Sequence, residues 1–123
     1  MKSLICAAAV FCLPFAAAGQ PRERSAPRGE PGKFDYYTLT LSWSPNFCAT
    51  GKNDPQCQGN RPFAFVIHGL WPQYDKEWPQ FCQPHSVVPP QIVDSMLLIM
   101  PSPALVQHEW DKHGTCSGLS QQA

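Results

Sequence analysis

Hydrophobic and polar positions alternate in the first regular stretch of the chain, which covers residues 36–43. Every second residue there is apolar, and the stretch is rich in aromatic and β-branched side chains, a pattern that predicts a β-strand. Pro45 lacks the backbone N–H that a strand uses for pairing, so we expect it to end this strand. Residues 48–61 contain Gly, Asn, Asp and Pro and predict a loop.

A second hydrophobic run covers residues 63–68 and predicts another strand. Because every position before His68 is apolar, the run indicates a central strand that is buried on both faces. Gly69 and Pro72 are expected to end it. Residues 73–90 then form a second irregular loop.

Two helices are expected after this loop. Apolar residues recur at helical spacing over residues 91–100 and predict the first helix. Ser102 suits an N-cap and Pro103 suits the first helical position, so a second helix is expected to follow over residues 104–113. Gly114 fits the residue directly after the end of that helix.

The N-terminal segment predicts export. Residues 1–18 combine a positive start, an apolar run and a small-residue Ala-Ala-Ala ending, as in a secretory signal peptide. The alternative is a membrane anchor, but the apolar run is shorter than the roughly 20 residues that span a bilayer. Residues 19–33 lack apolar periodicity and predict a disordered leader, whose arginines either contact RNA or are simply solvated. The folded domain is expected over residues 34–123.

Charge and cysteine content narrow the function classes. Nine basic residues balance nine acidic ones, which argues against binding nucleic acid by bulk charge but not against an enzyme that contacts a few phosphates. Signal cleavage would remove Cys6 and Cys12 and leave an even number of cysteines, which predicts two disulfides in an exported chain. The remaining cysteines are Cys48, Cys57, Cys82 and Cys116. Cys48 and Cys57 flank turn residues and are expected to close that loop.

Histidines are concentrated in two segments. His68 ends the second apolar run, and residues 108–113 read His-Glu-Trp-Asp-Lys-His. At about 100° per residue, one helix face about 140° wide would carry four chemically useful side chains. These are His108, Glu109, Lys112 and His113. Trp110 falls outside this face and is expected in the core.

Several kinds of chemistry could use such residues. A zinc protease needs two histidines at i and i+4, whereas Lys112 occupies i+4 here, which disfavours a metal site. Paired cysteines argue against a thiol nucleophile, and no nucleophile-elbow motif supports a serine triad. Acid–base catalysis at a phosphodiester uses two imidazoles and a cation. The structural alternative is a hydrogen-bonded His68 at a strand end and a basic helix terminus that interacts with the helix dipole.

These segments also carry a family resemblance. Residues 65–72 (Phe-Val-Ile-His-Gly-Leu-Trp-Pro) and 108–116 (His-Glu-Trp-Asp-Lys-His-Gly-Thr-Cys) resemble the two active-site segments of the ribonuclease T2 family. Residues 37–48 resemble its first strand, and the similarity spans residues 34–119. The resemblance implies an α+β fold with an antiparallel sheet flanked by helices. It also implies a Cys82–Cys116 disulfide beside Cys48–Cys57.

The resemblance further implies cleavage of single-stranded RNA with little base preference and with no metal or cofactor. In that reading, His113 is the general base that takes the proton of the ribose 2′-OH, and His68 is the general acid for the leaving 5′-oxygen. Glu109 and Lys112 stabilise the transition state, and His108 binds the phosphate. The product is a 2′,3′-cyclic phosphate, hydrolysed next to a 3′-phosphate. DNA, which lacks the 2′-OH, is not cut.

Two further residues have alternative interpretations. Trp71 matches a residue that stacks on a base in the family, and a core position beside Pro72 is the alternative. His85 lies outside both motifs and is expected at the surface.

Members of the family continue well past the second motif, whereas this chain ends at Ala123. We therefore expect a C-terminally truncated, incomplete domain. The chain is expected to be secreted or periplasmic and monomeric, with RNA as its partner and no membrane contact after signal removal. The alternative function is an inactive RNA-binding fragment of such an enzyme.

Overall fold

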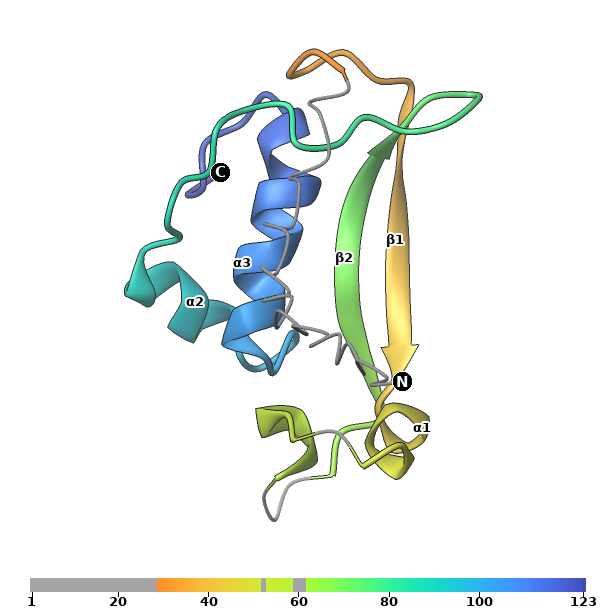
Figure 1. The fold of residues 1–123 in the computed structure, drawn as a ribbon, viewed down its shortest axis with the longest axis vertical. Helices are drawn as coiled ribbons and strands as arrows, with labels where there is room; N and C mark the ends of the chain where they lie inside the picture. Colours follow the sequence, from red (N-terminus) through yellow and green to blue (C-terminus); the bar gives the residue numbers. More distant parts are fainter. Residues whose placement is uncertain (1–28, 52, 59–61) are drawn as a thin grey trace, which may run out of the picture.

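The computed structural model describes residues 29–51, 53–58 and 62–123 of the chain (Figure 1). The predicted signal peptide and the first part of the predicted leader lie outside the described residues. The described part has a two-stranded antiparallel sheet with helices beside it, which confirms the predicted α+β class. None of its helices is long and apolar enough to cross a membrane.

The sheet consists of β1 (Tyr36–Trp43) and β2 (Phe65–Gln73). The first strand has the predicted bounds. The prediction that Gly69 and Pro72 end the second strand is wrong, because β2 continues through both residues. Within the described residues the sheet has two strands, and Pro72 lies opposite Tyr37. A proline is tolerated in such a strand where its missing N–H falls on an edge without a partner strand.

The pairing of the strands shifts by one residue in the middle of the sheet. Thr40 lies opposite Gly69, and Leu41 lies opposite Ile67. His68 is therefore the extra residue of a β-bulge on β2. A bulge changes the direction in which a side chain points and is common beside active sites, so the local irregularity sets the direction of His68.

The sheet leaves large apolar side chains exposed. Phe65 is 66% exposed and Leu70 is 53% exposed, so the prediction of a strand buried on both faces is wrong for the described residues. Leu70 lies opposite Leu39, and Phe65 lies opposite Trp43. Residues directly opposite each other share a face, so these four side chains form an exposed apolar face of the sheet.

The loop predicted after β1 contains short helical segments. Helix α1 (Ser44–Ala49) starts directly after β1, with Pro45 in its first turn. Pro45 therefore begins a helix as well as following the strand, because its fixed φ suits the first helical turn. A single 3₁₀ turn, η1 (Pro55–Cys57), follows, and a disulfide joins Cys48 to Cys57.

The two longer helices lie where the sequence predicts them. Helix α2 (Pro90–Met96) is shorter than the expected 91–100, because residues 97–100 form turns. Helix α3 (Pro103–Lys112) is followed by the 3₁₀ turn η2 (Gly114–Cys116). The chain thus continues in a tighter helix after α3. Gly114 is needed for space, because a Cβ atom there would overlap the indole of Trp110.

A small core joins the helices to the sheet. Its buried members are Val88, Met100 and Val106, and Ile67 of β2 packs against them. The Ile67 N–H also donates to the Ile99 carbonyl at 2.8 Å. Helix α3 consequently lies alongside β2, on the side away from β1 (Figure 1).

The last residues of the predicted leader belong to the described part of the chain. Residues 29–33 contain a turn in which Gly29 and Gly32 have φ values of +106° and +77°, which only glycine adopts readily. The Gly32 N–H donates to the Cys116 carbonyl at 3.0 Å. This bond joins the end of the predicted leader to the turn that follows α3.

Candidate active site

The carboxylate of Glu109 lies between two residues of β2. Its Oε2 accepts a hydrogen bond of 2.6 Å from the indole Nε1 of Trp71. Its Oε1 lies 3.4 Å from Nε2 of His68. Glu109 is buried on α3, and only 7% of the residue is exposed. The bulge of β2 and helix α3 thus meet at one carboxylate.

Both ring nitrogens of His68 have polar neighbours. Nε2 faces Glu109, and Nδ1 shares a hydrogen bond of 3.1 Å with Oγ of Ser42 on β1. A protonated His68 would therefore donate to Ser42 on one side and form an ion pair with Glu109 on the other. Sequence reasoning missed Ser42. The only sign of Ser42 in the sequence was its polar position in the alternating strand. The β-bulge that brings His68 close to Ser42 could not be predicted from the sequence.

Trp71 lies between the two histidines. Its ring stacks on His113 with centroids 4.7 Å apart and an angle of 18° between the planes. The ring of His68 lies edge-on to it, with centroids 5.8 Å apart. Trp71 thus binds the Glu109 carboxylate and covers one face of His113. Neither of its predicted roles, base stacking or a core position, included these contacts.

Gly69 provides the space for the bond between Trp71 and Glu109. A Cβ atom at this position would overlap both the Oε2 atom of Glu109 and the Nε1 atom of Trp71. Gly69, which was predicted to end the strand, is therefore part of the candidate site, because only glycine lets the Glu109 side chain approach β2 this closely.

His113 is the most deeply buried of the predicted catalytic residues, with 3% of its surface exposed. Burial, together with the positive charges of Lys112, His108 and His68, lowers the pKa of His113 from 6.5 to about 4. Its Nδ1 is buried and has no hydrogen-bond partner among the residues that the structure describes. The imidazole is consequently neutral at neutral pH and can accept a proton.

A pocket of about 290 Å³ opens beside His113. It is lined by Thr38, Trp71, Gln73, Trp78, Lys112 and His113. Trp78, 49% exposed, is a residue of this site that sequence reasoning left unassigned in its loop. His108, the predicted phosphate ligand, is exposed on α3 and is near enough for its charge to act on His113.

The end of α3 is anchored by the loop that precedes α2. The disulfide Cys82–Cys116 joins this loop to η2, directly after His113, as the resemblance implies. The neighbouring Phe81 N–H donates to the Lys112 carbonyl at 2.8 Å. Both contacts restrain the backbone that carries Lys112 and His113.

The sequence that forms this site matches a known protein family. The model of the ribonuclease T2 family matches residues 34–123. The chain belongs to the ribonuclease T2 family. The match confirms the resemblance and covers the whole of the expected domain.

Relatives within the ribonuclease T2 family include proteins from bacteria and plants. A ribonuclease of Aeromonas hydrophila is 48% identical over 95 residues, which cover 76% of this chain and 43% of that protein. Intracellular ribonuclease LX of Solanum lycopersicum is 34% identical over 104 residues, which cover 73% of this chain and 44% of that protein. The chain therefore spans less than half the length of these relatives.

A solved ribonuclease structure shares the fold. The crystal structure of RNase NT in complex with 5′-AMP superimposes with a TM-score of 0.62 at 31% identity, covering 74% of this chain and 52% of that chain. Within the described residues, no three His, Cys, Asp or Glu side chains lie together in a group that could hold a metal ion.

Proposed function

We propose that the site cleaves single-stranded RNA as an endoribonuclease, by transesterification from the ribose 2′-OH. The observation that carries this proposal is the pair of imidazoles beside Trp71, of which one is buried with its pKa lowered to about 4 and the other faces a carboxylate. One imidazole that takes up a proton and one that gives up a proton at the same site supply a general base and a general acid.

In the first step, His113 takes the proton of the 2′-OH and the 2′-oxygen attacks the phosphorus atom. The bond to the 5′-oxygen breaks, and His68 donates its proton to that leaving oxygen. The product is a 2′,3′-cyclic phosphate. Water then opens the ring to a 3′-phosphate, with the roles of the two histidines exchanged. No metal ion takes part in this mechanism, and DNA is not a substrate because it lacks the 2′-OH.

Two residues of α3 contact the phosphate in this mechanism. Lys112 lines the pocket beside His113 and neutralises charge on the phosphoryl oxygens, and the exposed His108 binds the phosphate. Glu109 contributes to transition-state stabilisation through His68. Direct contact between a carboxylate and a phosphorane would be repulsive, whereas a carboxylate whose Oε1 lies 3.4 Å from Nε2 of His68 can orient that imidazole.

The pocket next to His113 receives a base. Trp71 and Trp78 supply aromatic surface there, and stacking is tolerant of sequence because every base has a π-face. The complex of RNase NT with 5′-AMP supports a nucleotide as the ligand of a similar fold. The substrate is consequently single-stranded RNA with little base preference.

The biological setting is a further part of the proposal. The predicted signal peptide, the two disulfides and an extracellular ribonuclease of Solanum lycopersicum among the relatives support export to the periplasm or the medium. We propose a monomer with no membrane partner. The expected C-terminal truncation stays a prediction.

A second candidate function is RNA binding without cleavage. The exposed apolar face of the sheet formed by Leu39, Trp43, Phe65 and Leu70 favours it. In that case the site binds RNA but does not hold its residues firmly enough for turnover.

The deciding experiment is incubation of the chain with single-stranded RNA, with and without a chelator. Cyclic-phosphate product that persists in chelator, and is lost in His68→Ala and His113→Ala but not in the exposed control Gln122→Ala, supports the enzyme. RNA binding without product supports the second candidate. Activity that requires a metal ion would contradict the mechanism.

A further inference from the structure

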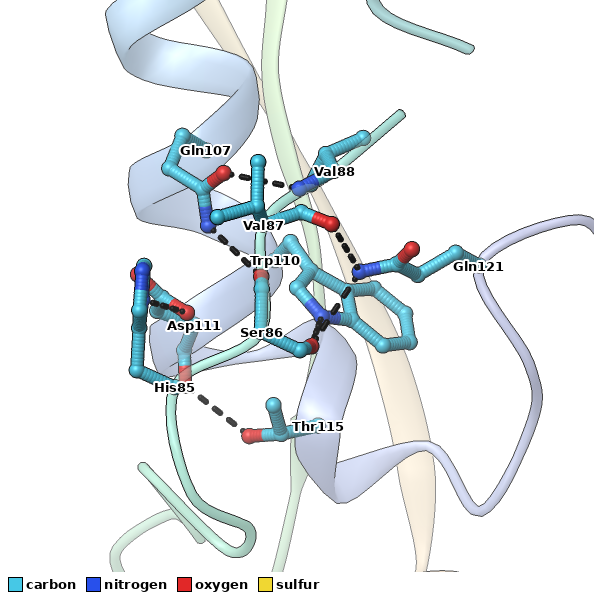
Figure 2. Close-up of polar contacts among 9 residues, drawn as sticks. All are labelled: His85, Ser86, Val87, Val88, Gln107, Trp110, Asp111, Thr115 and Gln121. Carbon is cyan, nitrogen blue, oxygen red and sulfur yellow. Dashed lines mark hydrogen bonds and ion pairs between the residues drawn. The ribbon is translucent and has the colours of Figure 1, made fainter. Parts of the chain in front are cut away.

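Residues 85–88, which we call the strap, cross the side of α3 that faces away from the catalytic residues. The helix residues that hold the strap are Gln107, Trp110 and Asp111 (Figure 2). At about 100° per residue, these positions lie on the opposite side of the helix from Glu109 and Lys112. The strap therefore binds α3 on the side of the helix opposite the candidate site.

Gln107 binds the strap backbone with both ends of its amide. Its Oε1 accepts from the Val88 N–H at 2.9 Å, and its Nε2 donates to the Ser86 carbonyl at 3.0 Å (Figure 2). A side chain that satisfies a backbone donor and a backbone acceptor two residues apart fixes the position of the strap along the helix, because both bonds fail if the strap slides.

Two further side chains of α3 hold the strap one turn later. The indole Nε1 of Trp110 donates to Oγ of Ser86 at 3.0 Å. Nδ1 of His85 donates to the Asp111 carboxylate at 2.8 Å. His85, exposed as the sequence predicts, thus pairs with the residue next to Lys112.

The strap is also held on its other side. The Gln121 amide donates to Oγ of Ser86 at 3.2 Å and to the Val87 carbonyl at 3.4 Å. Before the strap, the Cys82–Cys116 disulfide ties the same loop to η2. The strap therefore contacts α3 itself and also Gln121, which follows the end of α3 that carries Lys112 and His113.

We propose that the strap positions the catalytic helix, with Gln107 and His85 as positioning residues for Glu109 and His113. On the catalytic side, Glu109 meets β2 through its bond to Trp71. A helix rotation of about 10° would move a side-chain atom by roughly 1 Å, an error that can cost about a hundredfold in rate. The catalytic consequence rests on the function proposed above, whereas the positioning itself does not.

The test combines a spectroscopic measurement with kinetics. The variants are Gln107→Ala, His85→Ala and the double variant, and the matched control is Gln91→Ala, an exposed glutamine of α2. The first readout is the indole N–H resonance of Trp71, assigned by its loss in Trp71→Phe, which reports the bond to Glu109. The second is kcat and KM on single-stranded RNA.

We expect the Trp71 resonance to shift in both strap variants and not in Gln91→Ala, and kcat to fall about tenfold with KM changed less than about threefold. Gln107→Glu keeps one of the two backbone bonds and should give an intermediate shift. It also provides the comparison if Gln107→Ala does not fold. A lower melting temperature with an unmoved resonance and unchanged kcat would show a merely structural strap and overturn the proposal.

The two readouts separate this inference from the proposed function. If the unmodified chain does not cleave RNA, the enzyme proposal fails, yet a shift of the Trp71 resonance in the strap variants still supports positioning. If the chain cleaves RNA and the variants change neither readout, only the positioning inference fails.

Discussion

The indole N–H of Trp71 donates to the buried carboxylate of Glu109 at 2.6 Å, and this bond joins β2 to α3 at the centre of the candidate site. The same indole stacks on His113, and the other oxygen of the carboxylate faces His68. The relative position of the proposed base and acid therefore depends on one side-chain pair. Most of the predictions below test this pair or the groups around it.

Trp71→Phe removes the indole donor but keeps an aromatic ring against His113. Because the buried Glu109 loses its strongest partner, we expect the free energy of unfolding to fall by about 1–3 kcal/mol. The rate of RNA cleavage should fall at least tenfold, since Glu109 and His113 are no longer held together. Denaturant unfolding and initial rates measure the two effects. An unchanged rate would show that the bond does not position the site.

Gly69→Ala places a Cβ atom where Glu109 and Trp71 meet, so we expect it to break their bond and to lower cleavage as Trp71→Phe does. Gly51→Ala is the control, because among the described residues other than its chain neighbours no heavy atom lies within 4 Å of its new Cβ. Its positive φ of 72° should reduce stability by about 1 kcal/mol without affecting the rate. Equal rate losses in both variants would contradict the steric explanation.

The stability of the fold should decrease in acid because of His113. Its pKa is lowered from 6.5 to about 4 in the folded chain, so between these values the unfolded state binds more protons. The free energy of unfolding is therefore at its full value above about pH 6.5 and falls toward pH 4, by roughly 3 kcal/mol for this residue. Urea titrations from pH 4 to 7, compared between the chain and His113→Gln, measure this slope. The variant should lose most of it.

Lys112→Gln should raise the pKa of His113, because the lysine charge is one cause of its lowering. Burial, the larger cause, remains, so the pKa should stay below 6.5. An NMR titration of the His113 ring measures the change. Lys76→Gln, which removes an exposed charge, is the control and should leave the titration where it was. A shift to lower pH in Lys112→Gln would contradict the assignment.

The two disulfides should differ in their effect on activity. Cys82→Ser with Cys116→Ser opens a bond between residues 34 positions apart, with an expected loss of about 3–4 kcal/mol, against about 2–3 kcal/mol for Cys48 and Cys57, which are 9 apart. Removing the first pair should also lower the cleavage rate, since it anchors η2 directly after His113. Removing the second pair should leave the rate within about twofold. Melting curves and initial rates test both statements.

The sequence by itself determined the helices and strands that have a periodic hydrophobic pattern or a local motif. The alternation over 36–43 predicted β1 with its observed bounds, and the Ser102–Pro103 start predicted α3 to within about one residue. The histidine segments identified the family, which the match over residues 34–123 confirms. These signals depend only on neighbouring residues, so they are visible without a fold.

Only the tertiary structure decided how the site is assembled. The register shift that makes His68 a bulge, the bond from Trp71 to Glu109 and the lowered pKa of His113 each depend on contacts between segments far apart in the chain. The local propensities of Gly69 and Pro72 predicted the end of a strand, but contacts between distant segments outweigh local propensity, and β2 continues through both residues. Burial and cross-strand register are properties of the packed chain, and they place the predicted residues at one site.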